Sequence, residues 1–208
     1  MTNIENFIHA EDTDISVAMI TIIKDKYCFT LQPKNRWGKD KNQNDILYFG
    51  GIGGKVKPQE TLLEALHREA KEEIGCSFNL LPTLTQETPF ITKERLEIKQ
   101  ITATAKNPLP AFIFQNKRSE IGRKSYTNVF VYKTELTEQD KMQPLDNPAI
   151  ILIPKQTLYE MENGMPIATA QNKGVEIISK IPIPQNGILA PTPTPLALIK
   201  LHQNNITI

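Results

Sequence analysis

The sequence predicts an α/β fold. Short runs of apolar and β-branched residues, beginning with ISVAMITII at residues 15–23, are typical of buried strands. Residues 60–74 instead carry apolar side chains at helical spacing and predict an amphipathic helix. A chain of 208 residues is long enough for one domain with a sizeable core plus an extension.

The first elements are predicted to be strands. Residues 15–23 indicate a buried strand, and the turn-like residues 24–26 lead into a second strand at 27–31, which pairs back on the first. Residues 46–49 predict a short third strand. That strand leads directly into a stretch that is dense in glycine.

The polar segment 33–45 has two interpretations. It carries several lysines together with Arg36 and Trp37. An ordinary exposed loop is the first interpretation. The second is a flap that brings positive charge and an aromatic ring to a phosphorylated ligand. In that case Arg36 and Trp37 are candidate substrate contacts.

The sequence GGIGG at residues 50–54 predicts a turn ahead of the helix. Glycine tolerates positive φ and lets another group approach the backbone closely. The spacing fits neither a GxxxxGK[ST] phosphate-binding loop nor a dinucleotide-binding fingerprint, because Val56 stands where each requires a different residue. We therefore expect these glycines to serve another kind of site.

The predicted helix has two faces of opposite character. At about 100° per residue, one arc is apolar and faces the core. Its members are Leu63, Leu66, Ala70 and Ile74. Gly75 is placed to end the helix.

The second face of the helix carries Glu69, Glu72 and Glu73. Residues three and four apart are neighbours on a helix, so these carboxylates converge and repel one another. A hard divalent cation relieves that repulsion, and Mg²⁺ prefers oxygen ligands. A solvated acidic face is the alternative interpretation. The glycine turn just before the helix favours the metal site.

Beyond the helix the pattern returns to strands. Four segments predict strands, at residues 77–81, 111–114, 126–132 and 149–153. Residues 86–106 fit a strand or a helix equally well, so both remain open. Residues 116–125 form a basic stretch that we expect to be an exposed loop.

The C-terminal part predicts short elements separated by prolines. Pro154 is placed to open a short helix. Residues 181–195 contain five prolines and predict an extended or turn-filled connector. Thr194 and Pro195 fit the N-cap and the first position of a final helix at 196–202.

Composition limits the classes of partner. The net charge is +1, which argues against a dedicated nucleic-acid or membrane surface. Cys28 and Cys76 form no disulfide framework and no zinc spacing, so we expect reduced, buried thiols and a cytoplasmic protein. The polar first residues do not resemble a signal peptide, and no apolar run approaches the length of a membrane span.

The stretch from Gly54 to Cys76 resembles the signature box of the Nudix hydrolases, a MutT-like family. Every fixed position of the box is present, as Gly54-x5-Glu60-x7-Arg68-Glu69-Ala70-x-Glu72-Glu73-x-Gly75-Cys76. Lys57 and Gln59 stand where members often carry Glu and Gly. The resemblance implies a Nudix-like α/β/α sandwich with a mixed sheet, and a metal-dependent pyrophosphohydrolase.

The resemblance also implies roles for the residues of the box. Glu69, Glu72 and Glu73 would bind Mg²⁺, with Mn²⁺ as a second choice, and the Gly54 carbonyl would be a further ligand. Glu60 and Arg68 would form an ion pair that ties the loop to the helix.

Hydrolysis also requires a group that takes a proton from the attacking water. Glu69 is the first choice, and by the resemblance this base comes from a later loop in some members. The alternatives outside the box are Glu87, Glu94, Glu97 and Glu120.

We expect a Nudix hydrolase body at residues 1–153 and an extension at 154–208 packed on the same domain. The expected substrate is a small phosphorylated molecule, a nucleoside diphosphate derivative such as ADP-ribose or a nucleoside triphosphate. A homodimer is compatible with the sequence. The alternative function is a Nudix-fold regulator that binds a ligand without hydrolysis, and an isomerase on the same fold is a third. The intact carboxylate set favours the enzyme.

Overall fold

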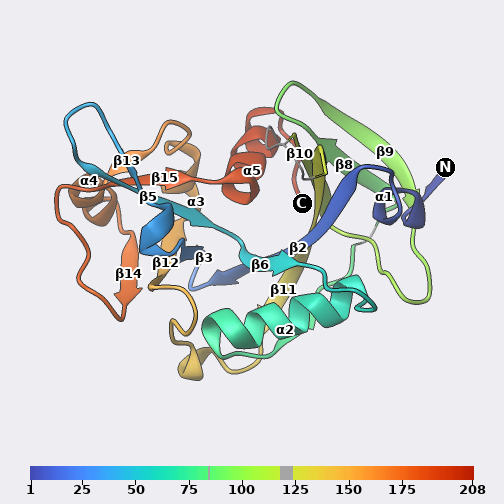
Figure 1. Ribbon diagram of the computed structural model, residues 1–208, viewed down its shortest axis with the longest axis horizontal. Helices are drawn as coiled ribbons and strands as arrows, with labels where there is room; N and C mark the ends of the chain where they lie inside the picture. Colours follow the sequence, from blue (N-terminus) through green and yellow to red (C-terminus); the bar gives the residue numbers. More distant parts are fainter. Residues whose placement is uncertain (84, 118–123) are drawn as a thin grey trace.

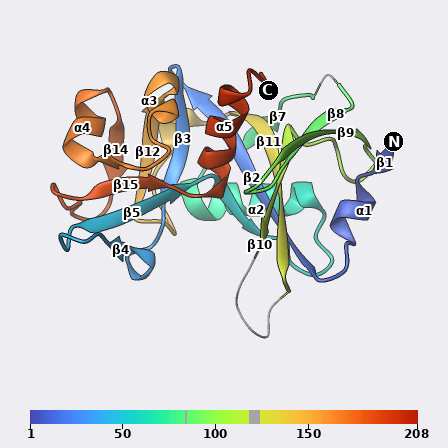
Figure 2. The same ribbon diagram turned by 90° about the horizontal axis from the view of Figure 1, so that it is seen from above.

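A computed structural model describes residues 1–83, 85–117 and 124–208, so Glu120 and most of the basic loop predicted at 116–125 lie outside the described residues. Within them, a mixed sheet of 15 strands has helices on both faces (Figures 1 and 2). The predicted α/β class is therefore confirmed. None of the helices in these ranges is long and apolar enough to cross a membrane.

The elements follow one another closely along the chain. The strands are β1 Thr2–Asn3, β2 Thr13–Ile23, β3 Lys26–Leu31, β4 Gly38–Lys39, β5 Asp45–Gly50, β6 Ile52–Lys55, β7 Phe78–Leu80, β8 Glu87–Ile91, β9 Leu96–Thr102, β10 Phe112–Lys117, β11 Tyr126–Leu136, β12 Ala149–Pro154, β13 Met165–Pro166, β14 Glu176–Ser179 and β15 Ile188–Pro191. The α-helices are α1 Glu5–Ile8, α2 Leu62–Ile74, α3 Lys155–Tyr159, α4 Ile167–Asn172 and α5 Pro193–Gln203, and single 3₁₀ turns lie at Lys34–Arg36 and Gln139–Lys141.

Strand β2 is the centre of the sheet. On one side it pairs in parallel with β11, from Thr13 opposite Tyr126 to Thr21 opposite Thr134. On its other side, its first half pairs antiparallel with β6 and its second half antiparallel with β3. The glycine-rich strand β6 is therefore fixed against the middle of the molecule.

Alternate side chains of the central strands enter two separate cores. Val17 and Met19 of β2 belong to the cluster that packs against α2. Ala18 and Ile20 belong to the opposite cluster, which packs against α3 and α5. Because β2 is covered on both faces, its sequence is almost uninterruptedly apolar.

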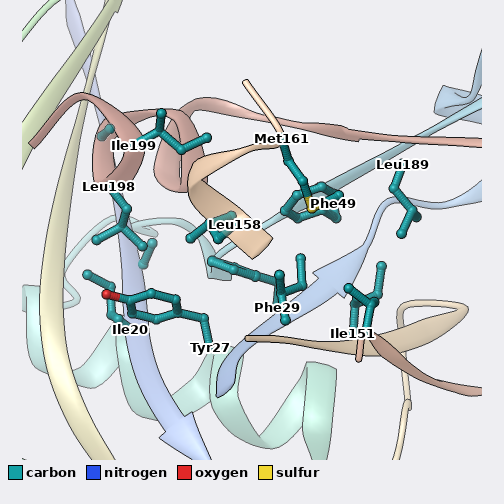
Figure 3. Packing of buried hydrophobic residues seen from close by; sticks show 14 of the residues in the cluster. Ile20, Tyr27, Phe29, Phe49, Ile151, Leu158, Met161, Leu189, Leu198 and Ile199 are labelled. Carbon is teal, nitrogen blue, oxygen red and sulfur yellow. The ribbon is translucent and has the colours of Figure 1, made fainter. Parts of the chain in front are cut away.

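The second core joins the C-terminal helices to the sheet. Figure 3 shows Leu198 of α5 and Leu158 of α3 close to Phe29 on β3. Leu158 and Phe29 are fully buried and Leu198 is almost so. On the far side of the sheet, α2 packs over β6 and β2.

Residues 86–106, left open between strand and helix, form the hairpin of β8 and β9. The side chains of β8 after the exposed Glu87 are buried, whereas β9 alternates between half-buried and exposed residues up to Ile101. The period of two is visible only in β9, which explains why the segment was ambiguous.

The prediction for the last helix was wrong at its start. Helix α5 begins at Pro193, and Thr192 is its N-cap in place of Thr194. Proline is tolerated in a first helical turn because the N–H groups there have no intrahelical partner. Part of the predicted connector is also a strand, since β15 pairs in parallel with β5.

Candidate active site

The prediction of a turn at residues 50–54 was wrong for most of them, since Gly50 ends β5 and β6 begins at Ile52. The name glycine turn is kept here for residues 50–54, which are held very close to their neighbours. Of its four glycines only Gly53 has a positive φ, of +156°. A Cβ atom on Gly53 would lie 2.1 Å from the carbonyl oxygen of Val17 on β2. A Cβ atom on Gly54 would lie 2.4 Å from Oε1 of Glu69. Close approach is thus the main reason for glycine here, more than positive φ.

Helix α2 presents the acidic residues to that turn. It begins two residues later than predicted, because Thr61 and Glu64 form a capping box. In this box Glu64 N donates to Thr61 Oγ1 at 3.2 Å, and Thr61 N donates to Glu64 Oε2 at 2.8 Å. Gly75 ends the helix at φ +71°, as predicted.

The apolar stripe of α2 differs from the predicted one in one residue. Leu66, Ala70 and Ile74 are buried as expected, but Leu63 is half-buried at the edge of the core. The remaining buried positions on this face are Leu62 and Ala65. On the other side of the helix, Glu69 lies against Gly54 and Glu73 against Gly53 of β6, whereas Glu72 is exposed.

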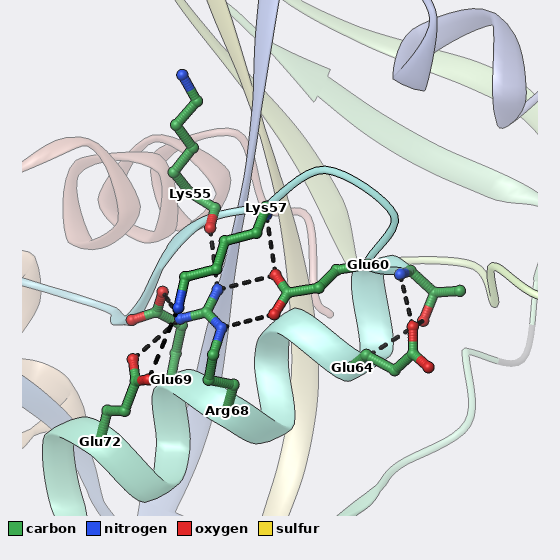
Figure 4. Close-up of polar contacts among 8 residues, drawn as sticks. Lys55, Lys57, Glu60, Glu64, Arg68, Glu69 and Glu72 are labelled. Carbon is green, nitrogen blue, oxygen red and sulfur yellow. Dashed lines mark hydrogen bonds and ion pairs between the residues drawn. The ribbon is translucent and has the colours of Figure 1, made fainter.

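Arg68 is the centre of the polar contacts (Figure 4). Its Nε and Nη2 atoms donate to the two oxygens of Glu60 at 2.7 and 3.0 Å. Its Nη1 atom donates to Glu69 Oε1 at 2.6 Å and to Glu72 Oε2 at 3.0 Å. Its Nη2 atom also reaches the carbonyl oxygen of Lys55 at 3.1 Å. One guanidinium thus connects β6, the loop and α2.

The ion pair expected from the resemblance, Glu60 with Arg68, is present in bidentate form. Glu60 also accepts a hydrogen bond from the backbone N–H of Lys57 at 2.9 Å. The Arg68 hydrogen bonds, with that backbone donor, lower the pKa of Glu60 to about 2. Glu60 is therefore ionised throughout the neutral range.

Glu73 occupies a different environment from the other two glutamates. Its Oε2 atom accepts from Thr30 Oγ1 at 3.1 Å and from Gly53 N at 3.3 Å. Burial, followed by the negative charge of Glu69, raises the pKa of Glu73 to about 7. Without a further cation nearby, this carboxyl group is partly protonated at neutral pH.

The donor set suits a hard divalent cation. Glu69 and Glu72 already share one cationic group, Arg68 Nη1, so the two carboxylates converge on a single positive charge. Within residues 1–83, 85–117 and 124–208, no three His, Cys, Asp or Glu side chains surround one point closely enough to hold an ion. Glu73 faces Thr30 and Gly53 instead. Arg68 is therefore the cation that pairs with Glu69 and Glu72 in this structure.

A cavity of about 640 Å³ adjoins the loop that enters α2. Lysines converge on it from three separate segments: Lys55, Lys57, Lys106 and Lys124. Lys55 is paired with Asp14 at 3.0 Å, and Lys57 Nζ lies 3.9 Å from Glu72 Oε1. Glu5, Asp14 and Glu60 line the same cavity, so most of the lysine charge is balanced, and the Lys57–Glu72 contact connects the cavity to the acidic face of α2.

The candidate contacts in the 33–45 segment lie against β3. Trp37 Nε1 donates to the carbonyl oxygen of Gln32 at 2.8 Å, and its ring packs on the second core. Arg36 Nη1 donates to Gln32 Oε1 at 2.9 Å. Arg36 is exposed, whereas Trp37 is half-buried.

The alternative bases lie away from the box in the sheet topology. Glu87 and Glu97 are on the β8–β9 hairpin, and Glu94 is in its turn. Glu97 is paired with Arg95 at 2.8 Å and with Lys99 at 2.9 Å. The hydrogen bond from Lys99 lowers the pKa of Glu97, so this carboxylate is engaged by cations of its own hairpin.

The sequence matches the family model described as NUDIX domain over residues 12–144. No curated protein sequence matches the chain. Structural likeness is found to a NUDIX hydrolase from Nitrosomonas europaea, with 17% identity, a TM-score of 0.38 and coverage of 64% of this chain and 66% of that one. A NUDIX family hydrolase from Clostridium perfringens has 18% identity, a TM-score of 0.42 and coverage of 71% and 85%. A MutT protein from Methanosarcina mazei has 17% identity, a TM-score of 0.44 and coverage of 72% and 83%. Because these three TM-scores are below 0.5, the assignment to a family rests only on the match of residues 12–144 to the NUDIX domain model.

Proposed function

This chain belongs to the Nudix family, and from that premise we propose that it is a pyrophosphohydrolase that depends on Mg²⁺ or Mn²⁺. Hydrolases of this family cleave pyrophosphate bonds in nucleoside diphosphate derivatives. The observation that carries the metal is the convergence of Glu69 and Glu72 on one cationic atom of Arg68. Two carboxylates that share a guanidinium nitrogen are placed to share a metal ion. Glu73 and the Gly54 carbonyl complete the proposed ligand set.

The chemistry divides between the ion and the side chains. When bound, the ion supplies neutralisation of the diphosphate oxygens and orientation of a water for in-line attack. We assign the removal of the proton from that water to Glu69, which lies against Gly54. Arg68 and Glu60 hold the carboxylates at the turn.

The substrate is a small phosphorylated molecule, and a nucleoside diphosphate derivative such as ADP-ribose is the first candidate. The four lysines of the 640 Å³ cavity outnumber its three carboxylates, Glu5, Asp14 and Glu60, and this small positive excess supports an anionic ligand beside the box. Arg36 and Trp37 stay predicted contacts. Buried free thiols at Cys28 and Cys76 support a cytoplasmic location, and a homodimer stays a proposal.

The test is a panel of nucleoside diphosphate derivatives and nucleoside triphosphates with Mg²⁺ or Mn²⁺, followed by release of phosphate or monophosphate. Glu72→Gln and Glu73→Gln should lower kcat by about a hundredfold or more, because each removes a charged ligand and keeps its size. Calorimetry should show Mg²⁺ binding to the wild type and much weaker binding to both variants.

The matched control is Glu135→Gln, an exposed glutamate at the end of β11. It should keep both metal binding and activity. Metal binding together with no hydrolysis of any compound would favour the alternative, a regulator that binds its ligand without cleaving it. Activity retained in both box variants would exclude the proposed ligand set.

A further inference from the structure

The C-terminal strand β15 and helix α5 lie outside the matched residues 12–144, yet they touch the glycine turn. Strand β15 runs parallel to β5, with Pro191 opposite Phe49. The next residue, Thr192, therefore stands where β5 ends and the turn begins. Figures 1 and 2 show β15 running beside β5 before the chain enters α5.

Thr192 donates two hydrogen bonds to the same acceptor. Its backbone N–H and its side-chain Oγ1 both lie 2.9 Å from the carbonyl oxygen of Phe49, which is fully buried. Thr192 is the N-cap of α5, but its hydroxyl makes no capping bond to that helix. Pro195, at the third helical position, has no N–H that could use the cap. The hydroxyl is bonded to the turn instead of to its own helix.

The two glycines that follow Phe49 are confined by the same segment. A Cβ atom on Gly50 would lie 2.5 Å from Thr192 Oγ1. A Cβ atom on Gly51 would lie 3.0 Å from Thr194 Cγ2 and 3.1 Å from the Cβ of Ala18. The turn is thus enclosed between the first turn of α5 and strand β2.

This enclosure continues directly into the candidate active site. Gly53 lies against the backbone of Val17, and Gly54 lies against the carboxylate of Glu69. The glycines have no side chains with which to fix their own position. Gly51 alone separates the end of β5 at Gly50 from the start of β6 at Ile52, and β6 is itself paired with β2, so Gly50 can influence Gly54 only through this short link.

We propose that Thr192 is a positioning residue of the active site: through the Phe49 carbonyl it fixes the glycine turn and so the placement of Gly54 against Glu69. The expected effect of Thr192 on catalysis rests on the proposed function. Its expected effect on the position of the glycine turn does not. The functional unit therefore includes a segment of the chain outside the matched family domain.

The test is Thr192→Val, which keeps the shape of the side chain and the backbone hydrogen bond but removes the hydroxyl donor. Amide hydrogen exchange at residues 51–55 should accelerate by about fivefold to tenfold, the usual effect of losing one partly buried hydrogen bond. Mg²⁺ affinity should fall by a similar factor. With substrate, kcat should fall by about tenfold while KM is unchanged, since the loss concerns geometry and not substrate contact. Thr192→Ser should restore all three.

The control is Thr157→Val in α3. Thr157 Oγ1 donates to the carbonyl oxygen of Lys173 at 3.0 Å, and the residue is buried, so a bond of the same kind is lost away from the turn. This variant should lose stability without faster exchange at 51–55 and without weaker Mg²⁺ binding. If Thr192→Val behaves like this control, Thr192 is structural only and the proposal is overturned. If the wild type cleaves nothing, the proposed function fails, but exchange at 51–55 still decides the role of Thr192.

Discussion

Arg68 donates hydrogen bonds to three glutamates and one backbone carbonyl, and no other cationic side chain can make the same set. Its side chain is only 18% exposed, so little water competes for these contacts. The residue neutralises the acidic face while that face holds no metal. We expect it to retain Glu60 and release Glu69 and Glu72 when an ion binds.

Arg68→Lys should therefore lower activity although the charge is kept. A lysine ammonium cannot bond Glu60 in bidentate form and reach Glu69 at the same time, so kcat should fall by about tenfold or more. The measurement is steady-state kinetics with saturating Mg²⁺. Arg95→Lys on the exposed β9 hairpin is the matched control and should have wild-type kinetics, because its pair with Glu97 is largely in solvent. Equal kinetics for both variants would mean that the fork geometry of Arg68 is unimportant.

Glu73 predicts a pH dependence of stability in the metal-free protein. Burial and the charge of Glu69 raise its pKa from the ordinary 4.5 to about 7. A raised folded pKa gives stability that is fully present below about pH 4.5 and is lost as pH rises through about 7. Urea unfolding in the presence of a chelator should show a loss of roughly 3 kcal/mol across this window.

Glu73→Gln removes the titrating group and should flatten this profile. At pH 8 the metal-free variant should be more stable than the wild type, and at pH 4 the two should be close. Added Mg²⁺ should stabilise the wild type by binding only the folded state, and the variant much less. Parallel pH profiles for the two metal-free proteins would show that Glu73 does not titrate in this range.

At the scale of elements, β6 and α2 meet at two glycines whose substitutions should separate folding from function. In Gly53→Ala the new Cβ would meet the backbone of β2 at 2.1 Å, and backbone cannot move aside cheaply. In Gly54→Ala it would meet the Glu69 carboxylate at 2.4 Å, the far end of a flexible side chain. The first change should break the β2–β6 pairing, and the second should displace one functional group.

We expect Gly53→Ala to destabilise the protein by roughly 3 kcal/mol or more and to lower soluble yield. Gly54→Ala should cost about 1 kcal/mol or less but should abolish Mg²⁺ binding and activity, because Glu69 is displaced. Urea unfolding and calorimetry of the two variants make the comparison. A Gly54→Ala protein that binds Mg²⁺ normally would contradict the described contact with Glu69.

Elements with a regular hydrophobic period and a clear end signal could be predicted from the sequence. Helix α2 has a clean apolar face and a glycine stop, so its end agrees with the prediction, whereas its start is set by the Thr61–Glu64 capping box and lies two residues later. The N-cap and first position of helix α5 were predicted two residues late, because prolines that were expected to prevent a helix fit its first turn. The short elements β1, α1, β13, α4 and β14 were not predicted, since two to six residues show no measurable period.

The residues of the candidate active site could also be predicted only in part from the sequence. The box predicted which carboxylates share a face of α2, because that depends on helix geometry alone. It did not predict that Glu73 would be buried against Thr30, since Thr30 lies on a strand far away in the chain. Nor did it indicate Thr192, whose role depends on β15 joining the sheet beside β5. Contacts between distant segments are set by the tertiary fold, and one sequence carries no direct signal for them.

At the scale of the whole molecule, residues 154–208 contribute to the same core as strands β3 and β5. Leu158, Leu189 and Leu198 pack in one cluster with Phe29 and Phe49. We propose that the predicted extension is therefore part of a single folding unit with residues 1–153. Unfolding followed by the fluorescence of the single Trp37 and by circular dichroism should give coincident transitions.

Leu198→Ala should then destabilise the whole protein by about 2 to 5 kcal/mol, because Leu198 is only 3% exposed and the change leaves a cavity. Both signals should shift together. Leu145→Ala is the control, since Leu145 is 39% exposed, and should shift the midpoint little. Two separate transitions, with only the second moved by Leu198→Ala, would instead indicate an independent C-terminal domain.

The pairing of β15 with β5 has a consequence for the order of events during synthesis. The ribosome releases β5, the glycine turn and α2 long before it has made Ile188, the first residue of β15. During that interval the Phe49 carbonyl lacks Thr192, and the long-range pairing cannot begin. We expect a nascent chain to carry all the carboxylates of the box without a finished turn to place them. The chain would then become active in a single late step, when β15 pairs with β5.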